Sequence, residues 1–347
     1  MLSRIKVALR MYCWCIFLVL ISAGVPGTMA AERPSVSDLL DKYAETQNKI
    51  QHSFNIKSES SGKFSYKHKS SKRSGEAHSF SEIRFDGDRT SLRTLRWGDL
   101  TSKIWDLPRS DALYRSYLWD GEQYISYLRE SFGGKYPNTA IINKDYGNEN
   151  MALRGGLHGQ FRGDYERVDS ILRQARNISM RHDLDEIKGN ACYVIDAITE
   201  QGKYTLWIDP NHGYNIAKAI VRKKEHQLFP KRPPSKNYVS LEVIENVRFE
   251  QIDGVWVPME ADLKYDGNYA HGYFSKSETH IKRTEVILNP DHDALGSFVP
   301  DDIENGSKVR VVQVPGVTYT WQDGELIPNI NKAERENQKG QKPNKKR

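Results

Sequence analysis

The sequence predicts a mainly β fold of the α+β kind: a long, curved antiparallel sheet with an N-terminal helix and one inserted helix. Three observations predict it. Apolar residues alternate with period two over most of the chain, Asp-Gly pairs separate these runs at short intervals, and only two segments have helical spacing. The 347 residues, 38% of them hydrophobic, suit a globular protein with a sizeable core and exclude a polytopic membrane protein or a collagen-like repeat.

The first thirty residues have the pattern of a secretory signal peptide. Arg4, Lys6 and Arg10 precede a short apolar run, and Thr28-Met29-Ala30 supplies small residues before the expected cleavage after Ala30. The apolar run is about a dozen residues long against the ~20 that span a bilayer, which favours cleavage over an uncleaved anchor. We therefore expect a protein of the periplasm or cell envelope, exported without a lipid anchor of its own.

Charge and cysteine content narrow the class of protein further. Without the leader, Cys192 is the last remaining cysteine, so no intrachain disulfide is expected. The net charge is +6, but the leader supplies three positive charges and the tail from Asn331 to Arg347 a further net five, which leaves the body at −2. The body therefore gives no support for binding nucleic acid. We expect the basic tail to be disordered, with solvation or weak, peripheral attraction to anionic lipid as its alternative roles.

Two segments have the spacing of amphipathic helices. Residues 36–50 follow Pro34-Ser35 and place Val36, Leu39, Leu40, Tyr43 and Ile50 on one face. The second helix is expected from about Asp164, as its N-cap, to Ala175.

The remaining body reads as strands joined by tight turns. Val255 to Tyr265 alternates most clearly, Val239, Leu241 and Val243 predict another buried face, and Tyr204, Leu206 and Ile208 follow the turn at Gln201-Gly202. Turns are predicted at Asp86-Gly87, Asp120-Gly121, Asp209-Pro210, Asp253-Gly254, Asp266-Gly267 and Asp323-Gly324. Less regular loops are predicted from Ser70 to Gly75 and from Lys223 to Asn237.

No motif in the chain names a reaction. The Gly155 to Gly163 segment could hold an anion at a helix start, but a flexible connection is favoured because the P-loop Lys-Ser/Thr pair is missing. Two clusters of acidic residues and histidine lie in polar connecting sequence without metal-ligand spacing. They comprise His182, Asp183 and Asp185, and Asp291, His292, Asp293, Asp301 and Asp302. We expect a non-enzymatic binding protein without metal or cofactor, and rank a metal-assisted hydrolase third.

Two sequence motifs resemble the LolA/LolB/RseB lipoprotein-carrier superfamily. Gly202 to Tyr214 reads GKYTLWIDPNHGY, similar to the paired strand and aromatic-Ile-Asp-Pro turn of that family, and Asp253 to Met259 reads DGVWVPM, similar to its next hairpin. The resemblance covers roughly Ser35 to Arg283. It implies an incomplete β-barrel covered by helices, with an apolar interior that binds acyl chains. No residue of this chain is matched to a cavity arginine of that family, so the resemblance assigns no functional residue.

These observations predict four regions and one ligand cavity. The regions are a signal peptide at 1–30, a LolA-like half-barrel at 31–283, a β extension at 284–330 and a basic tail at 331–347. The cavity is expected on the aliphatic face of the sheet, opposite Trp207 and Trp256, because acyl chains need a smooth apolar wall. Its candidate residues are Tyr204, Leu206, Ile208, Val255, Val257, Met259, Ala261 and Leu263. The expected ligand is a lipid, a lipoprotein or another amphiphile; the alternative is a sensor or scaffold of RseB type that binds an envelope protein through its C-terminal strands.

Overall fold

The computed structural model describes residues 33–68, 71–98, 112–129, 138–144, 155–228, 239–268 and 274–329. The chain divides into two units, Met1–Ser35 and Val36–Arg347, and the features below belong to the second. The expected signal peptide and basic tail lie outside the described residues.

The longest described helix is α2, Val36–Gln51, as the apolar spacing predicts. Leu39, Leu40, Tyr43 and Ile50 are buried along one face. Asp38 lies in the first turn and Lys49 in the last, where each charge is stabilised by the helix dipole. The helix therefore presents an apolar stripe to whatever lies beneath it.

The described residues form one large open sheet with short helices inserted between its strands. The strands are β1 Phe54–His68, β2 Ser71–Phe85, β3 Thr90–Gly98, β4 Leu113–Trp119, β5 Tyr124–Arg129, β6 Thr139–Asn143, β7 Asn177–Met180, β8 Asp185–Ile187, β9 Asn190–Ile198, β10 Lys203–Asp209, β11 Asn215–Lys224, β12 Val239–Ile252, β13 Val255–Asn268, β14 Phe274–Leu288, β15 Lys308–Val311, β16 Thr318–Gln322 and β17 Glu325–Pro328. The shorter helices are η3 Gly156–His158, α3 Val168–Arg173, η4 Pro210–His212 and α4 Glu225–Leu228.

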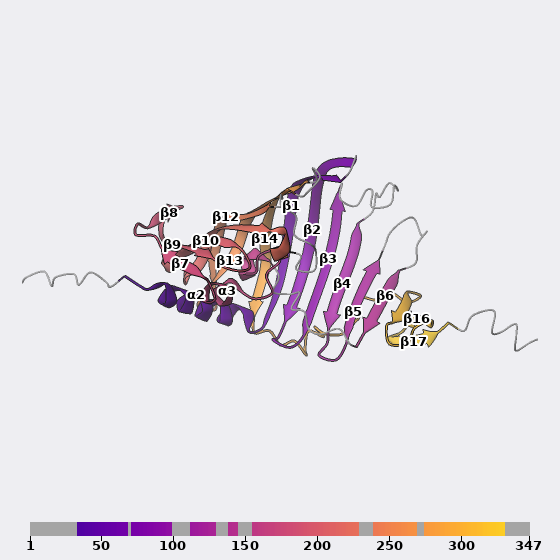
Figure 1. Cartoon of the computed structure of the whole chain (residues 1–347). Coiled ribbons are helices and arrows are strands. Elements are labelled where there is room, and N and C mark those ends of the chain that lie inside the picture. Colours follow the sequence, from indigo (N-terminus) through magenta and orange to yellow (C-terminus); the bar gives the residue numbers. More distant parts are fainter. Residues whose placement is uncertain are drawn as a thin grey trace, which may run out of the picture. The chain divides into compact units, whose positions relative to one another are not determined.

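One end of the sheet is formed by strands from the middle of the chain, and the first strand, β1, lies in the interior of the sheet between β14 and β2. β7 and β8 both pair with β9, which is followed in space by β10, β11, β12, β13 and β14. β14 then pairs with β1, and β2 to β6 continue in order to the parallel pair of β6 with β15. The predicted curved antiparallel sheet is confirmed, and Figure 1 shows that it stays open. β14 runs across residue 283, the boundary predicted between the two β regions; that boundary stays a prediction.

Most of the predicted turns join neighbouring strands. At Asp253-Gly254 both residues have positive φ, 49° and 78°, as a type I′ hairpin requires. Asp266-Gly267 is an exception, because it lies inside β13, opposite Leu241 and Ser240. The expected loop at 71–75 is also wrong: β2 begins at Ser71 and pairs with β1 through this stretch.

The second helix is shorter than predicted, and Asp164 does not cap it. α3 begins at Val168, after the N-cap residue Arg167, and ends at Arg173. Asp164 instead accepts hydrogen bonds from the Phe161 backbone N–H and the Tyr204 hydroxyl. A short polar residue before an apolar helical pattern is a frequent cap, but here a buried partner competes for the same carboxylate.

At the start of β12, the buried face is the opposite of the one predicted. Val239 is 50% exposed, whereas Ser240 and Ile244 are buried. Asn246 adopts a left-handed conformation and the pairing register shifts between Glu245 and Arg248, so the phase changes along the strand. Val247 is buried beyond that bulge.

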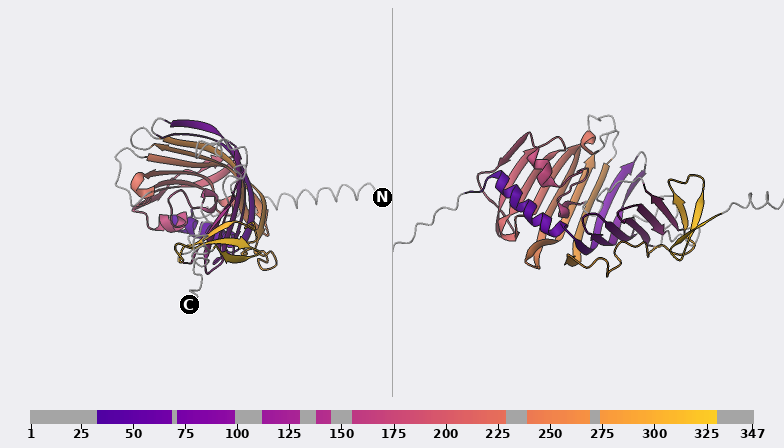
Figure 2. Two further views of the ribbon diagram at one scale, coloured as in Figure 1. Left: turned by 90° about the vertical axis from the view of Figure 1, so that its right-hand side faces the viewer. Right: turned by 90° about the horizontal axis from the view of Figure 1, so that it is seen from below.

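One face of the sheet, here called the concave face, is the face on which α2 and α3 pack (Figure 2). Over β9 to β13 these helices cover it, and we call this part the filled half. Where β1 and β2 meet the filled half, Ile50 of α2 and His158 of η3 pack on Phe54. No helix of the described residues covers the rest of β1 and β2, or β3 to β6 (Figure 1), and we call this part the open half. The segment after β14 packs on the opposite, outer face of β4 to β6, where Phe298, Val309 and Trp321 join a separate apolar cluster.

Candidate functional site

The eight predicted cavity residues all face the concave side, but they fall into two packed clusters. Tyr204, Leu206, Ile208 and Ala261 are each 1% exposed and belong to the cluster formed with α2 and α3; Leu263 packs against it. Val257 and Met259 pack instead with Ile50, Phe54, Ile56 and Phe85, with Val255 beside them. Trp207 lies on the outer face with Cys192 and Val194, as its alternation predicts.

Helix side chains occupy the space above the first of these clusters. Leu39, Leu40 and Tyr43 of α2 and Ile171 of α3 are no more than 3% exposed. A ligand that touched Leu206 would therefore have to replace these helical side chains. The predicted cavity stays a prediction, and the concave surface that is accessible without such a change lies in the open half.

Cross-strand pairing builds an apolar strip across the open half. Directly opposed inward residues form one row from Phe85 through Thr90 and Trp119 to Tyr124, and a second from Ile83 through Leu92, Tyr117 and Ser126 to Ile141. Most of the side chains on β3 to β6 in these rows are half-buried. The Tyr117 and Tyr124 rings stack with their centroids 6.4 Å apart. We call these two rows the apolar strip.

The next inward rows along the same strands carry hydroxyl groups and arginine. Ser81 opposes Thr94, which opposes Arg115, and Ser60 opposes Ser79, which opposes Arg96. The Ser60 and Ser79 hydroxyl oxygens lie 2.7 Å apart, close enough for a hydrogen bond. We call these rows the polar belt. Successive inward residues of a strand are about 6.6 Å apart, so the belt lies directly beside the apolar strip.

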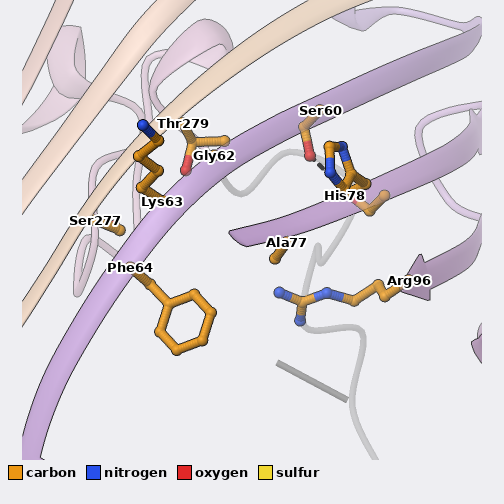
Figure 3. Close-up of a pocket in the computed structure, with 10 residues that line it drawn as sticks. Ser60, Gly62, Lys63, Phe64, Ala77, His78, Arg96, Ser277 and Thr279 are labelled. Carbon is orange, nitrogen blue, oxygen red and sulfur yellow. Dashed lines mark hydrogen bonds between the residues drawn. The ribbon is translucent and has the colours of Figure 1, made fainter. Parts of the chain in front are cut away.

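Beyond the belt a third row consists of small residues and forms a trough. Thr279 opposes Gly62, Gly62 opposes Ala77, and Ala77 opposes Gly98. A Cβ atom added to Gly62 would lie 2.4 Å from the Glu278 carbonyl oxygen, so the close approach of β1 and β14 requires glycine here. Figure 3 shows the pocket of about 230 Å³ above this trough, with Phe64 and Arg96 directed to the same side of the sheet.

Charge is strongly segregated between the two faces of these strands. The described parts of β1 to β6 and β14 place no carboxylate on the concave face; their acidic residues are on the outer face, where Lys57 pairs with Glu285 at 2.8 Å. Arg96 and Arg115 have no hydrogen-bond or ion-pair partner among the described residues. Partial desolvation by its neighbours, and to a smaller extent the charge of Arg115, lower the pKa of the Arg96 guanidinium. The described part of the open half is therefore a cationic surface that carries no carboxylate on its concave side.

A buried arginine lies where the open and filled halves meet. Arg283 of β14 is 3% exposed and donates to the Pro258 carbonyl at 2.8 Å and to His158 Nε2 at 3.1 Å. Burial lowers the pKa of Arg283 to about 10 and, together with the arginine charge, lowers the pKa of His158 well below its usual value. His158 is thus neutral, carries its proton on Nδ1, and stacks on Phe54 at 5.7 Å. Its Nδ1 is buried and has no hydrogen-bond partner among the described residues.

The filled half contains a buried ion pair that the sequence did not reveal. Lys223 Nζ contacts Asp164 Oδ1, and the side chains are 2% and 0% exposed. The Tyr204 hydroxyl donates to the same carboxylate oxygen at 2.7 Å. Burial raises the pKa of Asp164, and the lysine opposes that shift. The pair fastens the segment after η3 to β10 and β11. The Gly155 to Gly163 segment is accordingly packed into the interior, with His158 and Phe161 buried.

The two clusters of acidic residues and histidine hold the structure together or face solvent. His292 is buried and contacts Ser297 and the Phe85 carbonyl, Asp302 accepts from Tyr114 at 2.7 Å, and Asp301 pairs with Arg93. His182 and Asp183 are more than 90% exposed. Among the described residues no three His, Cys, Asp or Glu side chains come together as metal ligands would. No described helix has the length and apolar content needed to cross a bilayer.

Comparison with known proteins finds similarity only among solved structures. No family model matches the chain, and no curated protein matches its sequence. The chain is similar to a putative outer membrane lipoprotein-sorting protein domain from Vibrio parahaemolyticus, at 11% identity, over 73% of this chain and 92% of that one, with a TM-score of 0.33. It is also similar to a LolA superfamily protein from Nitrosomonas europaea, at 12% identity, over 78% and 100%, with a TM-score of 0.33. A chain of the MucA/MucB complex from Pseudomonas aeruginosa matches at 10% identity, over 73% and 99%, with a TM-score of 0.22.

Proposed function

We propose that the protein binds an amphiphile, a lipid or the lipid part of a lipoprotein, on the open half of its concave face. Binding is non-enzymatic and takes place in the cell envelope, to which the leader-like N-terminal residues direct the chain. The observation that carries the proposal is the apolar strip, which continues the packed core at Phe54 and Phe85 onto strands that no described helix covers.

The dimensions of the strip suit an acyl chain. Neighbouring strands are about 4.8 Å apart, so the four spacings from β2 to β6 extend roughly 19 Å. Each methylene group removed from water contributes about 0.8 kcal/mol, so a chain of a dozen carbons gains on the order of 10 kcal/mol before ordering costs. No polar motif is needed for such binding, which is why the sequence contains no conspicuous one.

A matched pair of variants on β3 tests the proposal. Leu92 belongs to the apolar strip, whereas Leu95 lies on the outer face of the same strand, and both are half-buried. Leu92→Glu should abolish uptake of a fluorescent fatty-acid probe, and Leu95→Glu should preserve it, with circular dichroism confirming that both variants fold. No uptake by the wild-type protein, or equal uptake by the two variants, would refute lipid binding at this surface.

A second candidate function is binding of an envelope protein through the C-terminal strands. Val312, Val314 and Ile327 are 43%, 38% and 46% exposed, and β17 is the last strand at its edge of the described sheet. An extended segment of a partner could pair with that edge. Native mass spectrometry of protein purified from membranes separates the two: a bound lipid supports the first function, and a stoichiometric polypeptide lost in an Ile327→Lys variant supports the second.

A further inference from the structure

The polar belt places two arginine side chains where they repel one another. Thr94 directly opposes Arg115, and Arg96 is the next inward residue of β3, so the two arginines are diagonal neighbours across β3 and β4. Diagonal positions are about 7 Å apart at the backbone, within reach for long side chains. Burial is the larger cause of the lowered pKa of Arg96, and the charge of Arg115 lowers it further. An anion bound between the two guanidinium groups would remove this repulsion.

The surroundings of these arginines suit an anion that bears an apolar chain. The Ser60, Ser79 and Thr279 hydroxyl groups line the pocket beside Arg96 and supply further donors. The pocket, at about 230 Å³, is smaller than the roughly 300 Å³ at which pockets for whole small-molecule ligands begin. It therefore suits a head group. In the apolar strip, Tyr117 lies one inward position from Arg115 on β4, and Leu92 lies two inward positions from Arg96 on β3.

A pocket on the outer face of the same strands lacks this character. It has a volume of about 500 Å³, and its lining includes the carboxylates of Glu76, Asp262 and Glu278. Several of its charged side chains are already partnered: His280 contacts Asp262 at 2.8 Å, and Lys264 pairs with Glu245 at 2.6 Å. An anion would meet repulsion there. Charge thus selects the concave pocket.

We propose that Arg96 and Arg115 bind the anionic head group, a carboxylate or a phosphate, of the amphiphile whose chain lies on the apolar strip. This proposal rests on the lipid-binding function proposed above and specifies the class of its ligand. Guanidinium groups form paired, charge-assisted hydrogen bonds with both kinds of oxyanion, and such bonds are about twice as strong as neutral ones. An amphiphile with the same chain and a neutral head should bind more weakly.

Displacement of a fluorescent fatty-acid probe from the full chain tests the proposal with three ligands of equal chain length. Dodecanoate and dodecyl phosphate should bind the wild-type protein roughly tenfold or more tightly than dodecanol, as expected for charged hydrogen bonds. The Arg96→Gln/Arg115→Gln variant should lose this preference while its affinity for dodecanol stays the same. Rising salt should reduce the preference in the wild type alone, because the arginines are accessible to solvent.

Two further variants control for charge and for shape. Lys72→Gln removes one positive charge from the outer face of β2 and should leave the preference intact. Ala77→Leu fills the trough without changing charge and should weaken dodecyl phosphate binding as strongly as loss of the arginines does. Ala77→Leu also tests the pocket if the double arginine variant fails to fold.

The outcomes separate this proposal from the one on which it rests. Tight dodecanol binding without any preference for the anionic ligands would overturn the head-group site and leave lipid binding standing. Failure of all three ligands to displace the probe would refute both. Displacement by inorganic phosphate at the same concentration as dodecyl phosphate would show a site for free anions, and would also overturn the proposal.

Discussion

The filled and open halves of the concave face are built on one continuous sheet, yet their inward residues differ in kind. In the filled half, Leu206, Ile208 and Ala261 oppose large apolar side chains of α2 and α3 and are almost completely buried. In the open half, the strip of apolar residues is followed by serine, glycine and arginine rows, with no described helix over them. One continuous sheet can therefore form a packed core with helices at one end and present an accessible surface at the other.

The largest expected effect concerns the buried ion pair of the filled half. Asp164→Asn removes the carboxylate that neutralises Lys223, and loss of one partner of a buried pair costs about 3–5 kcal/mol of unfolding free energy. Urea denaturation at neutral pH measures this change. A second substitution, Lys223→Met, should restore much of the loss, because no uncompensated charge then remains. Equal stability of the wild-type protein and Asp164→Asn would contradict a structural role for the pair.

The next prediction compares the two halves directly. Leu206→Ala leaves a void in a closed cluster and should lower the free energy of unfolding by about 2–5 kcal/mol. Leu92→Ala removes the same atoms from a half-buried position and should cost less than about 1.5 kcal/mol. Probe uptake should change in the opposite order, with the greater loss in Leu92→Ala among folded protein. Equal destabilisation by both substitutions would contradict the proposed difference in packing between the halves.

A smaller change in the free energy of unfolding is expected when the pH is lowered, because a buried histidine lies at the boundary between the halves. The pKa of His158 is well below 6.5 in the folded chain because of burial and the Arg283 charge, and burial also lowers the pKa of His292. Below about pH 6.5 these histidines bind protons in the unfolded chain but not in the folded chain, so the free energy of unfolding falls as the solution is acidified. Each such histidine contributes about 1.4 kcal/mol per pH unit until its folded pKa is reached.

Urea denaturation at pH 7.5 and pH 5.5 measures this loss in the wild-type protein and in His158→Gln. Glutamine can still accept the Arg283 hydrogen bond but does not titrate in this range. The difference in stability between the two pH values should therefore be smaller in the variant. An identical difference in both proteins would mean that His158 is protonated in the folded state.

The sequence predicted local structure well wherever one strand face is apolar and the other is polar. Val255 to Tyr265 and the helix at 36–50 have unambiguous periods, and both elements form as predicted. The phase of β12 could not be predicted, because Glu242 and Ser240 take inward positions beside the buried Lys223 and Asp164, and the bulge at Asn246 changes the phase. Valine at 239 is exposed as a result.

The open half could not be predicted from the sequence, because its rows combine residues that are far apart along the chain. Gly62 and Thr279 face each other only because β1 pairs with β14, more than 200 residues away, and local periodicity carries no information about that register. Ser60, Ser79 and Arg96 look like solvated polar residues when each strand is considered alone. The available signal was the alternation itself, which places every acidic residue of β1 and β2 out of phase with Arg96.

Photo-cross-linking with a fatty acid that carries a diazirine on its chain tests the central claim most directly. Adducts are expected on peptides of β3 to β6, at residues such as Leu92, Tyr117 and Ile141, and should be lost in Leu92→Glu but not in Leu95→Glu. Adducts concentrated on the filled half, at Leu206 or Ala261, would contradict this claim and would mean that the ligand displaces the helices.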